Sequence, residues 1–251
     1  MTQLRKLPAR SVIASTLLGT EPPVLSGRVL VQAAALFGIS EGTTRVALSR
    51  MVAAGELAAT DGMYSLVGSR LLERQARQAT SRRANTKRWR GRWLLAIVTA
   101  ERRDAADRSE LRERLGAARL AEMREGVWAR PDNIDVAWAD VVSEHCAIVT
   151  DAMIDPAITD ELWALDEWSS TAAALRRDMA ALVELLDRGD TSALAPGFIT
   201  SAAVLRHLQT DPLLPEELLP PNWPGRALRD EYDRFDVAYR KVLRDWFRSN
   251  V

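Results

Sequence analysis

Residues 38–66 of this chain have the sequence GISEGTTRVALSRMVAAGELAATDGMYSL. The stretch before them, residues 29–37, is rich in alanine and is typical of a helix, and Gly38 suits the left-handed position that ends one. Ser40 is a favourable N-cap and predicts a second helix over residues 43–54. Two helices joined by such a short turn predict a helix-turn-helix.

The second helix has an apolar and a polar face. Leu48, Met51 and Val52 share the apolar face, with Thr44 beside them, when residues are placed about 100° apart. The opposite face carries small polar and cationic side chains, which a helix-turn-helix presents to the major groove of DNA. The candidate DNA-binding residues of this helix are Thr43, Thr44, Arg45, Val46, Ser49 and Arg50. We expect Arg45 and the helix N-terminus to hold phosphates.

A β-hairpin is predicted directly after this helix. Asp61-Gly62 separates the short runs 57–60 and 63–66, and this dipeptide is typical of a two-residue type I′ turn. A helix-turn-helix followed at once by a hairpin is the winged-helix arrangement.

Charge is distributed unevenly along the 251 residues. The formal net charge is zero, which by itself argues against nucleic acid, because a DNA-binding protein must neutralise phosphates. However, residues 1–93 hold 15 Lys and Arg against 5 Asp and Glu, whereas residues 94–251 hold 19 against 29. The cationic excess at the N-terminal end favours DNA binding. A helix-turn-helix that serves as a protein-interaction adaptor, which would not need this excess, is an alternative.

The rest of the chain predicts two further parts. Strands are expected at residues 93–99, 123–130 and 146–154, and helices at 108–120 and 136–144, which suits a small ferredoxin-like sandwich with one strand still to be placed. From residue 156 the pattern is helical, over 160–188 with a potential break at Ser169-Ser170, over 199–209 and over 225–248.

The predicted fold class is therefore α+β and helix-rich, with four parts. They are an N-terminal winged helix-turn-helix DNA-binding domain (1–69), a basic linker helix (70–90), a central ferredoxin-like α/β sandwich (91–155) and a C-terminal helical domain (156–251).

Several protein classes are disfavoured by the composition. Cys146 is the only cysteine, so an internal disulfide is excluded and a reducing compartment is expected. No apolar run approaches the length of a membrane span, and the first residues lack the cleavage-site pattern of a signal peptide. The adjacent His145 and Cys146 have no second His or Cys near them in sequence, which disfavours zinc. We expect a cytoplasmic protein with no metal and no cofactor.

Five segments resemble the PaaX family of bacterial transcriptional regulators: ARSVIASTLLGT (9–20), GISEGTTRVALSRMVAAGEL (38–57), RWRGRW (88–93), EGVWARP (125–131) and LRHLQTDPLLPEELLPPNWPG (205–225). They are spread over nearly the whole chain in the family's order. The resemblance implies a homodimer that acts, mostly as a repressor, on an inverted-repeat operator of double-stranded DNA. It also implies control of a catabolic operon and release by an acyl-CoA effector such as phenylacetyl-CoA.

The hairpin departs from the family pattern. The sequence ATDGMYSL at residues 59–66 carries no arginine, whereas many relatives have arginines in the wing. Tyr64 is therefore the candidate in this hairpin for a phosphate contact.

Arginines near tryptophans are candidates to bind the effector. A CoA thioester carries several negative charges and an adenine ring, which guanidinium groups and aromatic rings bind well. The candidate effector-binding residues are Arg90, Trp93, Trp128, Arg130, His207 and Trp223. Trp93 and Trp128 also suit the core of the sandwich, and His207 suits a structural hydrogen bond.

Two enzyme classes are alternatives that we do not favour. Residues 38–42 match the G-x-S-x-G elbow of hydrolases, which would make Ser40 a nucleophile, but an elbow follows a buried strand and this segment follows a predicted helix. The ferredoxin-like domain resembles that of CRISPR-associated nucleases, which would need an acidic residue after the first strand. Glu101 is the candidate there. We expect no catalytic activity.

Overall fold

The computed structural model describes residues 8–20, 22–67, 82–99 and 104–250. The chain forms two compact units. The first unit consists of Met1–Ala79, Arg177–Ala202 and Glu231–Val251, and the second of Thr80–Arg176 and Ala203–Asp230. Among the described helices, none combines the length and apolar character needed to cross a membrane.

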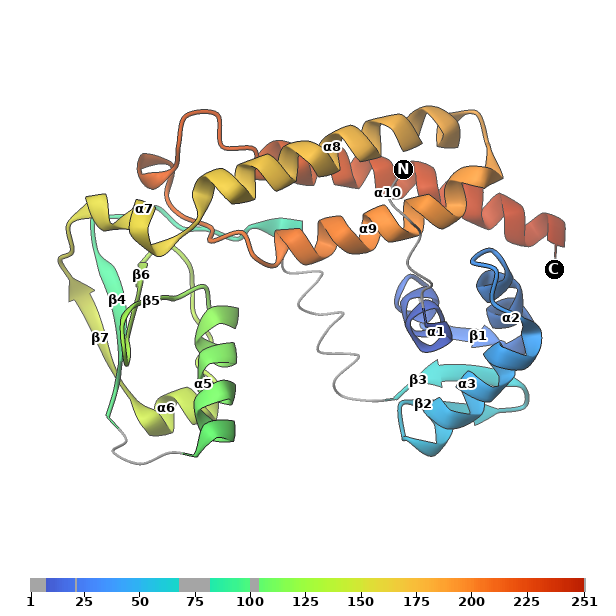
Figure 1. Cartoon of the computed structure of the whole chain (residues 1–251), viewed down its shortest axis with the longest axis horizontal. Coiled ribbons are helices and arrows are strands. Elements are labelled where there is room, and N and C mark those ends of the chain that lie inside the picture. Colours follow the sequence, from blue (N-terminus) through green and yellow to red (C-terminus); the bar gives the residue numbers. More distant parts are fainter. Residues whose placement is uncertain (1–7, 21, 68–81, 100–103, 251) are drawn as a thin grey trace. The chain divides into compact units, whose positions relative to one another are not determined.

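The N-terminal part of the first unit is a winged helix-turn-helix, as predicted (Figure 1). Its elements are α1 (Ala9–Leu18), β1 (Val24–Ser26), α2 (Gly27–Ala35), α3 (Glu41–Ala53), β2 (Leu57–Thr60) and β3 (Met63–Leu66). The strands form an antiparallel sheet in the order β1-β3-β2. Strand β1 was not predicted, because three residues are too few to show an alternating pattern.

The turns of this motif have the predicted local chemistry. Gly38 has φ +69° and ends the segment after α2, and the Oγ atom of Ser40 accepts a hydrogen bond from the backbone N–H of Thr43 at 3.3 Å, which caps α3. Asp61 and Gly62 have φ +49° and +75°, as a type I′ turn requires.

One apolar cluster holds the winged helix together. Its buried residues are Ile13, Ala14, Leu17, Leu30, Leu48, Met51, Leu57 and Leu66. The same unit contains parts of α9 (Leu194–Leu208) and α10 (Gly225–Asn250). The rings of Phe37 and Phe198 lie 4.8 Å apart edge to face, and Arg240 Nη1 donates to the carbonyl of Gly19 at 2.7 Å. These contacts join the winged helix to the C-terminal helices of its unit.

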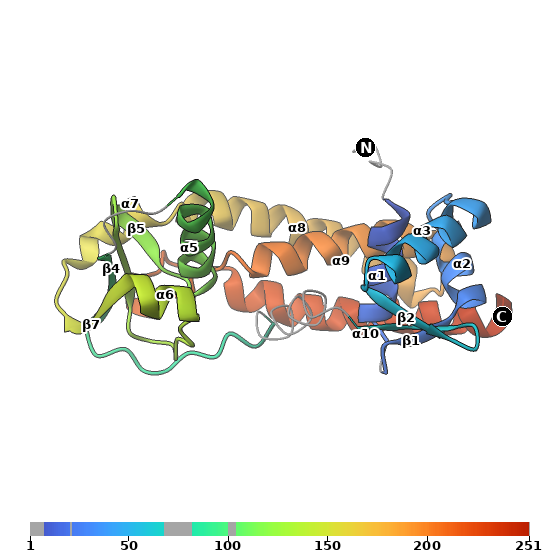
Figure 2. The same cartoon turned by 90° about the horizontal axis from the view of Figure 1, so that it is seen from below.

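The second unit contains a four-stranded antiparallel sheet. Its elements are β4 (Trp93–Val98), α5 (Ala105–Ala117), β5 (Ala121–Arg124), β6 (Val127–Pro131), α6 (Asp140–His145) and β7 (Cys146–Ala152). The strand order β5-β6-β4-β7 is that of the predicted ferredoxin-like sandwich. Helices α5 and α6 cover one face (Figures 1 and 2), where Leu111, Leu115 and Val142 pack against Trp128.

Residues 123–130 were wrongly predicted as one strand. They contain the end of β5 and most of β6, which pair as a hairpin. Gly126 has φ +76° and allows the turn that the apolar pattern does not show. The additional strand is the one that the sequence could not place.

The C-terminal part is helical, as predicted, but its first break is elsewhere. Its elements are the short helices η1 (Pro156–Ile158), α7 (Thr159–Leu162), η2 (Thr191–Ala193) and η3 (Glu216–Leu218), together with α8 (Leu165–Asp187), α9 and α10. The break lies at Trp163 and not at Ser169-Ser170, because Trp163 is extended (φ −128°, ψ 131°) and its ring stacks on Trp93.

The predicted linker helix over residues 70–90 lies mostly outside the described residues. Within the described part, residues 84–90 are not helical, which corrects the prediction there. Ala84 has φ +43°, and the backbone N–H of Lys87 donates to the carbonyl of Asn133 at 2.7 Å, so this segment is held to the central domain in a non-helical form.

Replacing a helical glycine by alanine is expected to have opposite effects on stability at two positions. A Cβ atom on Gly197 in α9 would lie 2.9 Å from Cδ2 of Tyr239, so Gly197→Ala is expected to destabilise the protein by about 1–3 kcal/mol. A Cβ atom on Gly116 in α5 would meet nothing within 4 Å, so Gly116→Ala is expected to stabilise it by about 0.5 kcal/mol. Thermal denaturation of the full chain checks both, and shifts of the same sign would contradict the packing described for Gly197.

Candidate nucleic-acid interface and effector pocket

The outer face of α3 is exposed and mixed in character. Thr43, Ser49 and Arg50 are exposed, and the side chain of Val46 is 52% exposed. An open hollow of about 720 Å³ lies beside this face. Its lining includes Ala9 and Arg10 of α1 and Thr43, Val46, Ala47 and Arg50 of α3. Helix α3 therefore presents the apolar Val46, the polar Thr43 and Ser49 and the cationic Arg50 on a single accessible surface.

The cations of the winged helix differ in their partners. Arg45 pairs with Glu41 at 2.7 Å, and Arg10 pairs with Glu56. Within the described residues, Arg28 and Arg50 are exposed and have no carboxylate partner. Exposed ion pairs such as Arg45–Glu41 contribute little free energy, so Arg45 can exchange its partner for a phosphate.

Thr44 does not belong to this face. Its side chain is fully buried, and its hydroxyl donates to the carbonyl of Ser40 at 3.0 Å. The prediction of Thr44 as a DNA-binding side chain is corrected, because the helical period places it with the core residue Leu48.

Tyr64 lies beside the N-terminus of α2. Its ring packs against the winged-helix core and approaches Gly27 so closely that a Cβ atom there would lie 3.0 Å from Cε2. Ser26 caps α2 by accepting a hydrogen bond from the N–H of Val29, and Arg28 is exposed in the first turn. A helix N-terminus with a cation and a tyrosine beside it suits a phosphate. Arg28 was missed, because a single arginine at the start of a helix gives no distinctive sequence signal.

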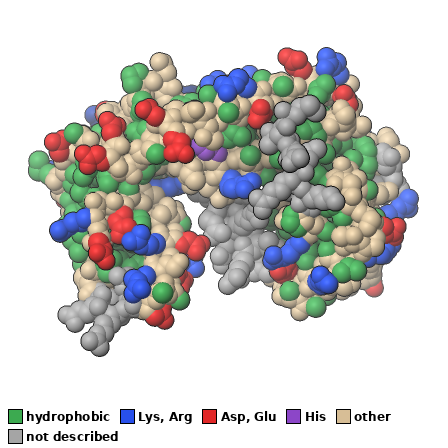
Figure 3. All heavy atoms as spheres, viewed as in Figure 1, with side chains coloured by type: hydrophobic (Ala, Val, Ile, Leu, Met, Phe, Trp, Pro, Cys, Tyr) green, Lys and Arg blue, Asp and Glu red, His purple; other side chains and the backbone are tan. Residues whose placement is uncertain are grey.

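Charges of both signs are mixed over the face of the molecule in Figure 3. Blue Lys and Arg side chains lie among red Asp and Glu side chains on that face. The N-terminal excess of cations in the sequence is therefore not visible as one uniform field among the described residues of this view.

The structure separates two of the predicted effector residues. Trp128 faces α5 and α6 and pairs across the strands with Ala96. Trp93 is three residues before Ala96 and faces the other side of the sheet, where it stacks on Trp163 at 6.4 Å. Trp128 is a core residue, and it shares no site with Trp93. Arg90 is exposed.

Arg130 is a structural residue and not an accessible effector ligand. Its side chain is fully buried, and its Nη2 atom donates to Oδ1 of Asn133 at 2.8 Å and to the carbonyl of Leu213 at 3.5 Å. Its other nitrogens donate to the carbonyls of Pro131 and Ala118. Burial lowers the pKa of Arg130 to about 9. The prediction of Arg130 as an effector contact is corrected, because protein oxygens already occupy its guanidinium.

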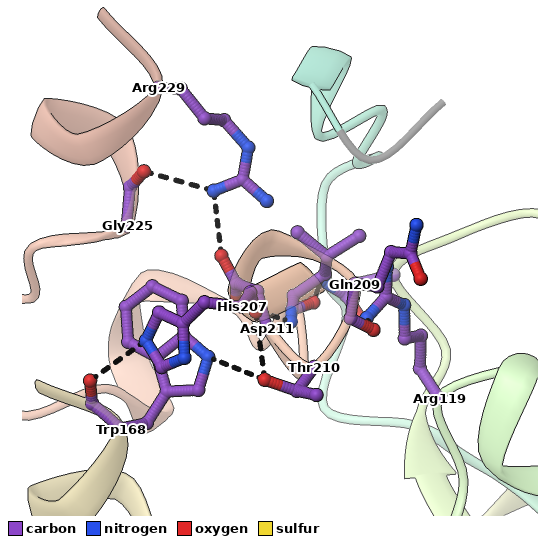
Figure 4. A network of polar contacts seen from close by, with 10 residues as sticks. Arg119, Trp168, His207, Gln209, Thr210, Asp211, Gly225 and Arg229 are labelled. Carbon is purple, nitrogen blue, oxygen red and sulfur yellow. Dashed lines mark hydrogen bonds and ion pairs between the residues drawn. The ribbon is translucent and has the colours of Figure 1, made fainter. Parts of the chain in front are cut away.

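His207 and Trp223 come together around Trp168. The rings of Trp168 and His207 stack at 4.3 Å, and those of Trp168 and Trp223 at 4.5 Å. Nε2 of His207 lies 3.0 Å from the carbonyl oxygen of Trp168 (Figure 4). Burial lowers the pKa of His207, so the imidazole is neutral near pH 7 and its Nε2–H donates to that carbonyl.

A pocket of about 290 Å³ lies beside these rings in the second unit. It is lined by Trp163, Ala164, Leu165, Glu167, Trp168, Thr171, His207, Thr210 and Pro212. Trp163, Trp168 and Thr171 were not predicted as site residues, because their helical spacing suggests only a packed face. Aromatic walls with a few polar groups are typical of a small-molecule site.

Asp211 organises the polar contacts behind this pocket (Figure 4). Its Oδ2 atom accepts from Nη1 of Arg229 at 2.6 Å, and its Oδ1 atom accepts from the N–H of Leu213 at 3.0 Å. A Cβ atom on Gly225 would lie 2.9 Å from Oδ2 of Asp211 and 2.5 Å from Nε1 of Trp223. Arg119 donates to the carbonyl of Gln209, and burial lowers its pKa while Asp211 raises it. The segment 211–225 is thus fixed by buried polar contacts.

The enzyme alternatives have little support in these residues. Ser40 follows helix α2 and a turn, not the buried strand that a nucleophile elbow requires, so the hydrolase alternative is contradicted. Glu101, the acidic candidate for a nuclease, lies outside the described residues.

A winged helix-turn-helix, a ferredoxin-like domain and C-terminal helices together define a three-part class of protein. The sequence matches PaaX-like protein over residues 8–69, the PaaX protein central Cas2-like domain over 86–153 and the PaaX-like protein C-terminal domain over 154–249. The chain therefore belongs to the PaaX-like family, whose members are typically transcriptional regulators.

A solved structure supports the same assignment. The uncharacterized protein Rv0674 from Mycobacterium tuberculosis is 41% identical, with a TM-score of 0.76, and the similarity covers 93% of this chain and 96% of that one. No curated protein matches this sequence.

The stability of the protein is expected to depend strongly on both Asp211 and Arg229. The two side chains are 2% and 8% exposed, so Asp211→Ala leaves a buried guanidinium without this carboxylate and is expected to cost about 3 kcal/mol or more. The double variant Asp211→Leu/Arg229→Met is expected to lose less free energy of unfolding than the sum of the losses for Asp211→Leu alone and Arg229→Met alone. Thermal denaturation of the full chain measures the difference.

The control is the exposed pair Arg226–Asp230 on the same helix, whose side chains are 94% and 69% exposed. Arg226→Met and Asp230→Leu are expected to change stability little. Equal effects for the buried and the exposed pair would contradict the role given to Asp211.

Proposed function

We propose that this protein is a sequence-specific DNA-binding transcriptional regulator that represses a catabolic operon as a homodimer. The observation that carries the proposal is the outer face of α3, where Val46 and Arg50 are exposed while Leu48 and Met51 of the same helix are buried. Membership of the PaaX-like family supports it.

The proposed interface divides into base and phosphate contacts. Thr43, Val46, Ser49 and Arg50 face the base edges in the major groove. Arg45, Arg28, Tyr64 and the N-terminus of α2 hold the backbone phosphates, which fix the position of the helix. Two copies of the winged helix bind the two halves of an inverted repeat.

Arg50→Ala is the first test of this interface. A guanidinium that contacts a base edge contributes about 1–3 kcal/mol of discrimination, so the variant is expected to bind its operator about 5- to 150-fold more weakly with unchanged thermal stability. Fluorescence anisotropy with the duplex upstream of the protein's own gene measures this. Arg112→Ala is the control, because Arg112 is exposed, pairs with Glu122 and lies in the central domain. Equal affinity of the Arg50 variant and wild type would refute the placement.

We further propose that an acyl-CoA effector, such as phenylacetyl-CoA, releases the DNA. The acyl group enters the pocket beside Trp163, Trp168 and His207, and its volume of about 290 Å³ suits a single planar group rather than the whole thioester. The exposed arginines of residues 88–92 supply positive charge for the phosphates of CoA.

Filling this pocket tests the effector site separately from DNA binding. Thr171 is exposed on α8 and lines the pocket, so Thr171→Phe is expected to occupy it without burying new polar groups. In the anisotropy assay, the variant is expected to bind the duplex as wild type does but to need about two- to tenfold more phenylacetyl-CoA for release, since a lost aromatic contact costs about 0.5–1.5 kcal/mol. Ser170→Phe, at an exposed neighbour that does not line the pocket, is the control. Equal release of all three proteins would exclude this pocket.

A further inference from the structure

Val46 is the most prominent apolar group on the outer face of α3. Its side chain is 52% exposed, although the apolar residues on the other side of the helix, Leu48 and Met51, are each 2% exposed. It lies three residues after Thr43 and four before Arg50, and all three line the same open hollow. Val46 is not among the residues of the apolar cluster that holds the winged helix together.

The base edges of DNA offer few apolar partners for such a side chain. In the major groove, guanine, cytosine and adenine present hydrogen-bond donors and acceptors, and thymine adds a methyl group at C5. A valine can exclude water from that methyl group, but it can neither donate nor accept a hydrogen bond.

We propose that Val46 reads the 5-methyl group of a thymine in each operator half-site. The inference rests on the proposed function, because it assumes that α3 enters the major groove. Arg50 has no carboxylate partner among the described residues and suits the O6 and N7 atoms of a guanine. Four residues of helix span about 6 Å, which corresponds to about two base pairs, so this thymine lies within about two base pairs of that guanine.

The test removes the methyl group of each thymine from the DNA and, separately, the two methyl groups of Val46 from the protein. Duplexes are first selected from a random pool with the full-length wild-type protein. Each thymine of a selected half-site is then replaced by deoxyuridine, which lacks only the methyl group. For wild type, one thymine per half-site is expected to show a loss of affinity of about fourfold, which corresponds to one buried methyl group.

The variant Val46→Ala is expected to bind the thymine and the deoxyuridine duplexes equally. Val149→Ala is the matched control, because Val149 is 38% exposed on β7 in the other unit, and it is expected to retain the fourfold difference. Circular dichroism confirms that each variant is folded, and this is expected because both valines are exposed.

Two outcomes overturn the inference while leaving DNA binding intact. Either no thymine of the selected half-site is sensitive to loss of its methyl group, or Val46→Ala retains the full sensitivity of wild type. If the wild-type protein selects no sequence at all, the proposed function fails together with the inference.

Discussion

Buried guanidinium groups hold the proline-rich segment 211–225 in place, and the second unit depends on them. Arg229 pairs with Asp211 at the start of α10, and Arg130 of strand β6 donates to the carbonyl of Leu213. Burying a charge is costly unless its donors are satisfied, so loss of the partners of either arginine is expected to destabilise the protein. The segment has no long helix or strand of its own, and side chains instead bond the backbone of Leu213 and Gly225.

The same contacts bring together two distant sequence segments that resemble the family. EGVWARP contributes Arg130, and LRHLQTDPLLPEELLPPNWPG contributes Asp211, Leu213 and Gly225. Gly225 is required because Asp211 and Trp223 occupy the space of a side chain. Both segments therefore have a structural reason for their composition. Arg130, which was predicted to bind the effector, instead holds the segment 211–225 through the carbonyl of Leu213.

Local rules predicted the helices and the hairpin of the winged helix but not its strand β1, and they did not predict the candidate effector pocket. Ser40, Gly38 and Asp61-Gly62 act on residues within a few positions of themselves, so the turns and the outer face of α3 could be predicted. The pocket instead depends on Trp168 and His207, which are 39 positions apart and meet only because the start of α8 lies against the end of α9. The break at Trp163 has the same origin, since it follows from stacking on Trp93, 70 residues earlier in the sequence. Periodicity alone cannot reveal either contact.

The helices that line the pocket also bear on how binding of the proposed effector would affect the proposed DNA-binding face. Helices α8 and α9 place Trp168 and His207 in the second unit, and both helices also contribute residues to the unit that contains the winged helix. A ligand shifts an equilibrium only by the difference in its affinity for the two states. Weakening operator binding about a hundredfold requires a difference of about 2.7 kcal/mol. This is within the range of allosteric coupling and within reach of an aromatic group in the pocket that Trp163 and His207 line. A small pocket is therefore sufficient for the proposed control, provided that the two arrangements of α8 and α9 differ in the space that they leave there.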